Sequence, residues 1–241
     1  PFKWHLQYEK GLAGFTGNIY TAFGKAIHSV CEQSALGNLT EDPYPDHFDW
    51  TFLEELKALD EKPDNKMIVD MREQSRRIFD KVFPALQNLF PGYEVYSSEE
   101  SLYEPITELK FNRYLKGFID LVVKTPDGKY HIIDWKSCSW GWDAQKRSDT
   151  MVTYQLTLYK KFFCEKHGID PNDVETYFGL LKRTAKEDNV EIFRITSGSR
   201  KTTNATKVLT NACKLINKGV KVKNRNSCTY CPFNHTEHCK R

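Results

Sequence analysis

Asp120, Asp134 and Lys136 are the residues whose types and spacing first indicate chemistry, because they lie in a stretch that is otherwise largely apolar. Side chains alternate along a strand, so these three are expected on one face of a β-hairpin. Two carboxylates this close repel each other unless a cation lies between them. Carboxylate oxygens are the ligands that Mg²⁺ and Mn²⁺ prefer, so the spacing predicts a divalent-metal site. The alternative is a solvated sheet end at which Lys136 only pairs with one aspartate.

The element that must position these residues is a hairpin over residues 117–137. Two apolar, β-branched runs flank the segment TPDGK at 125–129. Pro126 suits the first position of a type I turn, and Gly128 suits the left-handed residue that follows it. This turn places residue 125 opposite residue 129, and counting outward from it places Asp120 opposite Asp134.

The residues of this hairpin, Gly117-x-x-Asp120 and Ile132-Ile133-Asp134-Trp135-Lys136, resemble the PD-(D/E)XK nuclease superfamily and specifically its RecB-like exonuclease branch. The resemblance implies that Asp120, Asp134 and the backbone carbonyl of Trp135 hold the metal. It also implies that Lys136 orients the attacking water or helps to deprotonate it. Ile119 replaces the proline of the family name, which is usual in this branch.

A histidine upstream extends the resemblance. Gly24, His28 and Glu32 recur every four residues on a helix predicted over 21–36, so they share one face. In the RecB-like branch this histidine is a further metal ligand, which implies that role for His28, with Glu32 orienting it. Glu99 and Glu100 are candidate acidic groups near the metal, although exposed strand glutamates are the favoured interpretation.

Gln155 and Tyr159 lie four residues apart on the helix predicted over 152–167, so their side chains meet on one face. Without the resemblance, a glutamine and a tyrosine at this spacing on a helix would not indicate a function. In the RecB-like branch this pair lines the site and contacts substrate, so the resemblance implies the same for Gln155 and Tyr159.

The segment 139–150 between hairpin and helix is rich in aromatic and charged residues. Trp140 and Trp142 could stack on bases, and Lys146 and Arg147 could meet phosphates. The alternative is that both tryptophans close the edge of the core.

Three cysteines close the chain as Cys228-x2-Cys231-x7-Cys239, a spacing at which thiolates commonly hold a metal or a cluster. The tail resembles that of AddB helicase-nucleases and CRISPR-associated four-cysteine exonucleases, which implies a structural [4Fe-4S] cluster. Its fourth cysteine is then expected just upstream of Pro1, in a chain trimmed at its start. The alternative is Zn²⁺ held by the three cysteines and His235 or His238, with free thiols a third possibility. The other four cysteines are expected to be ordinary buried thiols.

Composition fits one globular domain, since the 241 residues are 39% hydrophobic and 28% charged. No apolar run reaches the roughly 18 residues of a membrane span, and no signal peptide is visible. We therefore expect a cytoplasmic protein of a bacterial or phage-infected cell that is neither secreted nor bound to a membrane. Residues 200–241 carry ten Lys or Arg and a single acid, which suits a phosphate backbone. Residues 40–63, which are rich in acidic residues, are expected to form a surface insertion.

These patterns predict an α/β restriction-endonuclease-like core with a mixed central sheet, flanking helices and a C-terminal metal-binding tail. The single domain 1–241 divides into a helical part (1–90), a catalytic sheet and helix (91–197), and a basic helix with the tail (198–241). The predicted function is a Mg²⁺- or Mn²⁺-dependent DNA exonuclease on single strands or duplex ends, in repair or recombination and beside a helicase or recombination partner. The alternatives are a structure-specific endonuclease and an inactive nucleic-acid-binding module.

Overall fold

A five-stranded mixed sheet forms the centre of the computed structural model, which describes residues 2–12, 17–39, 43–225, 228 and 231–240. The strands follow chain order across the sheet: β1 Glu94–Pro105, β2 Tyr114–Lys124, β3 Tyr130–Cys138, β4 Val174–Lys182 and β5 Val190–Ile195. Neighbours are antiparallel except β3 and β4, which are parallel. A parallel pair needs a crossover, and α5 (Ala144–Ser148) and α6 (Thr150–His167) provide it.

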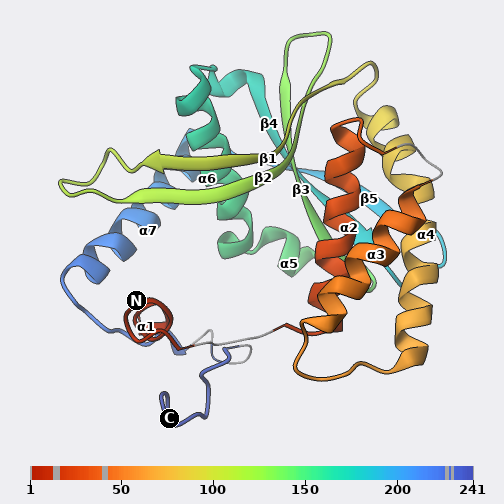
Figure 1. Ribbon diagram of the computed structural model, residues 1–241. Coiled ribbons are helices and arrows are strands. Elements are labelled where there is room, and N and C mark those ends of the chain that lie inside the picture. The colour runs from red at the N-terminus through yellow and green to blue at the C-terminus, as the bar shows by residue number, and fades with distance from the viewer. Residues whose placement is uncertain (1, 13–16, 40–42, 226–227, 229–230, 241) are drawn as a thin grey trace.

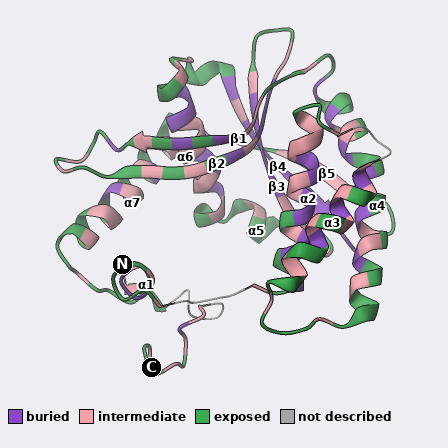
Figure 2. Ribbon diagram, in the orientation of Figure 1, coloured by how far each residue is buried: buried purple, intermediate pink, exposed green. Residues whose placement is uncertain are grey.

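Helices cover both faces of the sheet (Figure 1). One hydrophobic cluster joins the sheet to α2 (Ile19–Ala35), α3 (Tyr44–Lys57) and α4 (Asn65–Leu89), and a second joins it to α6 and α7 (Ser199–Asn217). Buried residues line the inner sides of these helices and the middle of the sheet (Figure 2). The remaining helical segments are short: α1 Phe2–Trp4, η1 His5–Glu9 and η2 Pro171–Asp173. The predicted α/β core with a mixed, helix-flanked sheet is therefore confirmed.

The hairpin has the predicted register. The backbone N–H of Thr125 donates to the carbonyl of Lys129 at 2.9 Å, and the ladder then runs from Lys124–Tyr130 to Leu121–Ile133. The next positions outward are 120 and 134, so the two aspartates stand at the point where the pairing of β2 with β3 ends.

The segment 43–57 differs from the prediction of a surface insertion. It forms α3, and Phe48 and Phe52 are completely buried against Phe23 of α2, with ring centroids 5.3 and 6.2 Å from it. Two of its acidic residues are neutralised by the neighbouring helices, since Asp49 pairs with Arg72 of α4 and Glu55 with Lys25 of α2. The prediction was wrong because the acidic composition hid an amphipathic helix with an aromatic inner face.

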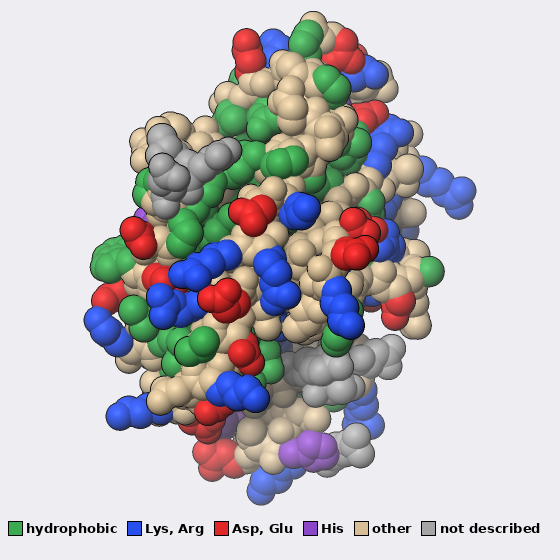
Figure 3. Space-filling model, turned by 90° about the vertical axis from the view of Figure 1, so that its right-hand side faces the viewer, with side chains coloured by type: hydrophobic (Ala, Val, Ile, Leu, Met, Phe, Trp, Pro, Cys, Tyr) green, Lys and Arg blue, Asp and Glu red, His purple; other side chains and the backbone are tan. Residues whose placement is uncertain are grey.

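Figure 3 shows the side of the molecule that faces right in Figure 1, where acidic and basic side chains are interspersed. No single-sign patch dominates the described part of this face. None of the helices in the described ranges is long and apolar enough to cross a membrane.

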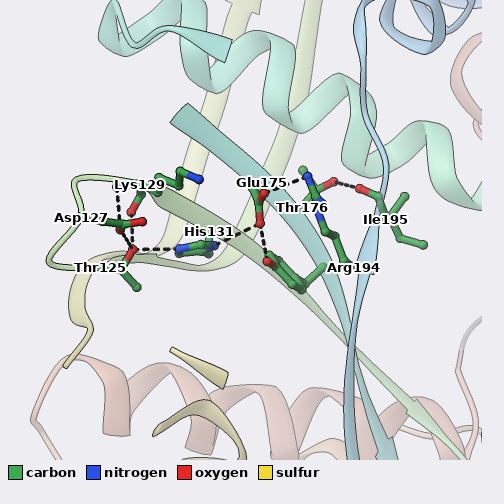
Figure 4. A network of polar contacts seen from close by, with 9 residues as sticks. Thr125, Asp127, Lys129, His131, Glu175, Thr176, Arg194 and Ile195 are labelled. Atoms are coloured by element: carbon green, nitrogen blue, oxygen red, sulfur yellow. Dashed lines mark hydrogen bonds and ion pairs between the residues drawn. The ribbon is translucent and has the colours of Figure 1, made fainter. Parts of the chain in front are cut away.

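A polar network holds the turn end of the hairpin against β4 and β5 (Figure 4). The Thr125 hydroxyl lies 3.0 Å from Nε2 of His131, whose Nδ1 is 3.9 Å from the Glu175 carboxylate. Glu175 in turn pairs with Arg194 at 2.8 Å and accepts from the Tyr177 hydroxyl at 2.5 Å. Burial lowers the pKa of His131 below its ordinary value of 6.5, and the charge of Glu175 opposes this only in part.

This network predicts a pH dependence of stability. Because the pKa of His131 is lower in the folded state, the unfolded chain binds more protons between the folded pKa and 6.5. The contribution of His131 is therefore complete above pH 6.5 and is lost as the pH falls toward the folded pKa. We expect the urea midpoint of unfolding to depend less on pH in His131→Gln than in the wild type, over the range between the folded pKa of His131 and 6.5. Equal slopes in both proteins would contradict the assignment.

Candidate metal centre

The end of the β2–β3 ladder is bridged by a side chain. Oδ2 of Asp120 accepts the backbone N–H of Trp135 at 2.6 Å, so this buried donor is satisfied by a carboxylate instead of a strand partner. The Trp135 ring is 2% exposed and lies over Gly179 of β4, where an added Cβ would come within 2.2 Å of the ring. Asp120 is thereby fixed between β2 and β3, with its other oxygen free for another partner.

That partner comes from α2. Nδ1 of His28 lies 3.6 Å from Oδ1 of Asp120. An Asn18 capping box starts α2, and Gly24 lets the helix approach β3, since an added Cβ would lie 3.2 Å from the Ser137 hydroxyl. A shallow groove of about 780 Å³ opens along this face of α2, lined by Gly24, His28, Glu32, Glu99 and Ser137.

One group of potential metal ligands assembles here. His28, Glu99 and Asp120 each offer an atom, and these atoms all lie within 4.8 Å of one another. Glu99 stands between the pairs Ser98–Leu121 and Glu100–Ile119 and therefore opposite Asp120, with an unusual positive φ of 46°. A nitrogen and two carboxylates suit a hard divalent cation. The favoured interpretation of Glu99 and Glu100 as exposed was wrong: Glu99 is half-buried, and Glu100 is buried against Lys166 and His167 of α6.

Burial and the acidic charges together shift the pKa values of three groups at this centre. Burial alone would lower the pKa of His28, but the carboxylates of Asp120 and Asp134 outweigh it, so its pKa is raised. Burial, together with the charges of Asp120 and Glu32, raises the pKa of Glu99. Burial, together with the charge of Asp120, also raises the pKa of Asp134, although Lys136 opposes the shift. Each shift follows from burial and from the charges around the group.

Asp134 and Lys136 form a close pair next to these ligands. Nζ of Lys136 is 2.5 Å from Oδ2 of Asp134, whose side chain is only 2% exposed, whereas that of Lys136 is 32% exposed. The ammonium group is therefore held by the buried carboxylate while part of the lysine side chain still faces solvent.

The helix α6 contributes the pair Gln155 and Tyr159. Nε2 of Gln155 donates to the Tyr159 hydroxyl at 3.0 Å. Burial raises the pKa of Tyr159, and the charges of Asp134 and Lys136 also act on it, which places the phenol beside the hairpin residues. Gly117 makes room for the ring, since an added Cβ would lie 2.8 Å from its Cε1.

A model of the PD-(D/E)XK nuclease superfamily matches residues 1–236. The chain belongs to this superfamily. It therefore belongs among nucleases that use divalent metal ions.

The fold of this nuclease also resembles a solved structure. The "Putative exonuclease" of Eubacterium rectale shares 14% identity over 100% of this chain and 82% of its own, with a TM-score of 0.60. The structure of SSO0001 shares 13% identity over 88% of this chain and 92% of its own, with a TM-score of 0.43. Among curated proteins, none matches the sequence significantly.

The segment after β3 differs in part from the prediction. Trp142 is 8% exposed and packs against Phe178 at 4.9 Å between ring centroids, so it closes the core edge and offers no face to a base. Arg147 donates to the Trp142 carbonyl and pairs with Glu191 at 2.6 Å, so its guanidinium is already engaged. Trp140 is 75% exposed, and Lys146 is exposed above the Trp142 ring. The sequence could not separate these roles because both tryptophans share one local context.

The cysteine tail folds back on the N-terminal segment of the nuclease. Cys228, Cys231 and Cys239 line one pocket of about 460 Å³ together with Phe2 and Lys3. The backbone N–H of Phe2 donates to the Val222 carbonyl at 3.2 Å, which ties the two ends of the chain together. Of the other cysteines, Cys31 and Cys164 are buried, whereas Cys138 and Cys213 are only partly buried. Pro1, whose context entered the prediction of a fourth cysteine, lies outside the described residues.

Gly117 supplies a prediction about the site. Gly117→Ala is expected to push the Tyr159 ring away from the aspartates and lower the rate of phosphodiester cleavage by roughly 10- to 100-fold, because misplacement by about 1 Å is costly. Gly198→Ala is the matched control, since an added Cβ there meets nothing within 4 Å. Equal cleavage rates for the two variants would contradict the role of Gly117.

Proposed function

We propose that this nuclease is a Mg²⁺- or Mn²⁺-dependent DNA exonuclease that hydrolyses phosphodiester bonds on single strands or duplex ends. The observation that carries the proposal is the group of His28, Glu99 and Asp120, with its ligand atoms within 4.8 Å, beside the pair of Asp134 and Lys136. The E. rectale structure that covers the whole chain bears the name of an exonuclease, which supports this choice within the superfamily.

Separate side chains would hold the metal, orient the water and position the phosphate. His28, Asp120, Asp134 and the Trp135 carbonyl would hold the metal, and Glu99 would be an additional ligand, since its carboxylate lies within 4.8 Å of the ligand atoms of His28 and Asp120. When bound, a divalent ion lowers the pKa of water and stabilises negative charge on the phosphate.

Lys136 orients the attacking water, for which its ammonium group is held in place by Asp134. Gln155 and Tyr159 position the scissile phosphate through the amide and the phenol that they already align with each other. Lys146 and Trp140 remain candidates for contacts with the nucleic acid downstream.

A second part of the proposal concerns the tail, in which Cys228, Cys231 and Cys239 would hold a structural [4Fe-4S] cluster. Their shared pocket and its contact with Phe2 support a group that staples the two chain ends. Zn²⁺ is the alternative, with His235 or His238 as a fourth ligand. Iron quantification with a visible absorption band supports the cluster, and a colourless, zinc-loaded protein contradicts it.

The nuclease proposal is tested on end-labelled linear and covalently closed circular single-stranded DNA, with Mg²⁺, Mn²⁺ or chelator. Release of label that needs metal and spares circles establishes the exonuclease. Cutting of circles would instead make the protein an endonuclease at the same site. Binding without any cutting would make it an inactive module. A cytoplasmic location and a helicase or recombination partner remain predictions of the sequence comparison.

A further inference from the structure

The strands β1 and β2 continue beyond the core as a two-stranded arm, which projects to the left in Figure 1. One face of the arm packs on α6, since Leu102 and Ile119 are completely buried in the cluster that includes this helix. Gly117 belongs to the same face, because its missing Cβ points at Tyr159. Side chains alternate along a strand, so positions 114, 116 and 118 belong to the opposite face.

This opposite face begins at the metal centre. Glu99 and Asp120 stand opposite each other, and the strand pairs Ser101–Phe118, Tyr103–Lys116 and Pro105–Tyr114 then follow along the arm. The distance from Asp120 to Tyr114 along β2 is six residues, or about 20 Å at the usual rise of a strand. The same surface that ends in metal ligands therefore extends outward for a span of several nucleotides.

Aromatic rings cover this face and face solvent. Phe118 is 47% exposed, Tyr103 63% and Tyr114 48%. The two tyrosine rings are stacked, with centroids 4.8 Å apart and planes within 3°. Exposed rings in a row are unusual on a soluble protein, and bases of any sequence can stack on such rings.

The ring face carries a positive charge at Lys116, which lies between Tyr114 and Phe118. Lys116 is exposed and has no ion pair with a carboxylate among the described residues, and Lys110 and Arg113 are exposed in the loop that joins the two strands. The acidic residues of the arm are engaged or lie elsewhere: Glu108 pairs with Lys161 of α6, and Glu104 is half-buried at a position that belongs to the α6 side. Exposed rings with an unpaired lysine among them and further cations in the adjoining loop suit a single nucleic-acid strand, whose bases stack while its phosphates meet the cations.

We propose that Phe118, Tyr103 and Tyr114, with Lys116, form a stacking track that guides a single-stranded nucleic acid along the arm into the metal centre. The inference rests on the proposed nuclease function and names the substrate class of that site. Stacked bases of a duplex cannot reach the rings, so the track selects an unpaired strand.

Two alternative roles of this face are outcomes of the test. The Tyr103–Tyr114 stack could serve only as a cross-strand pair that stabilises the arm. A second copy of the chain could cover the rings in a dimer.

The test measures the fluorescence anisotropy of labelled oligothymidylate and oligouridylate of about 15 nucleotides, in chelator so that no cleavage occurs. Phe118→Ala, Tyr103→Ala and Tyr114→Ala are each expected to raise Kd by about 5- to 100-fold. Tyr103→Phe, which keeps the ring, is expected to retain wild-type affinity. Trp50→Ala is the matched control, because this ring is 64% exposed on α3, away from the arm.

The outcomes separate the alternatives. Unchanged Kd in all three ring variants, or equal losses for blunt duplex and single strand, would overturn the track. Sedimentation that shows a dimer broken by Tyr103→Ala, with DNA affinity intact, would assign the face to a second copy. Ring-dependent binding without cleavage in any metal would refute the nuclease proposal and leave the track standing. Metal-dependent cleavage with binding that does not depend on the rings would support the nuclease proposal and refute the track.

Discussion

Asp134→Asn is expected to lower DNA cleavage by about 100- to 1000-fold while the protein stays folded. The amide keeps the size of the side chain and can still accept a hydrogen bond from Lys136, whose Nζ lies 2.5 Å from the carboxylate. It cannot supply the negative charge that binds a divalent ion and holds the lysine. Single-turnover cleavage of end-labelled single-stranded DNA in saturating Mn²⁺ measures the loss.

The control is Asp80→Asn, which makes the same chemical change at an exposed position of α4. Circular dichroism and the thermal midpoint of both variants show whether the fold is intact. If Asp134→Asn cuts DNA at the rate of Asp80→Asn, the chemistry does not run through this carboxylate and the proposed site is wrong.

Phe48→Ala is expected to be the most destabilising of the substitutions considered, costing about 3–5 kcal/mol of the free energy of unfolding. The Phe48 ring is completely buried and meets three other rings, those of Phe23, Phe52 and Phe79, at centroid distances of 5.2 to 5.8 Å. Its removal leaves a cavity between α2, α3 and α4. For a chain of this length the midpoint of thermal unfolding should fall by on the order of 10 °C.

Trp50→Ala on the same helix is the matched control, because a larger aromatic ring is lost from a position that is 64% exposed. Its effect is expected to stay within about 0.5 kcal/mol. Urea unfolding at one pH compares the two variants. Equal, small losses would mean that α3 is a surface insertion after all, as its acidic composition indicates.

The acidic composition of α3 does not reveal its buried face, for a general reason. Acidic residues and prolines describe the outer face of α3, whereas its stability comes from Phe48 and Phe52, which contact α2 and α4. Composition averages both faces, and only the packing partners, which are distant in the chain, show which face is inside. Trp140 and Trp142 show the same limit, because one is exposed and the other is covered by Phe178 and Phe193.

Residues close together in the chain allowed the sequence by itself to predict the hairpin. Pro126 and Gly128 determined the turn, the turn determined the register, and the register placed Asp120 and Asp134 level with each other. The superfamily also followed from motifs in chain order and is confirmed over residues 1–236.

Only the tertiary structure decided what depends on segments brought together from afar. Glu99 joins His28 and Asp120 because β1 pairs with β2 in one particular register, and α2 reaches the same place because Gly24 lets it approach β3. The aromatic face of the arm is exposed because α6 covers the other face. Local propensity and turn chemistry act over a few residues, whereas burial and ligand geometry depend on the whole fold.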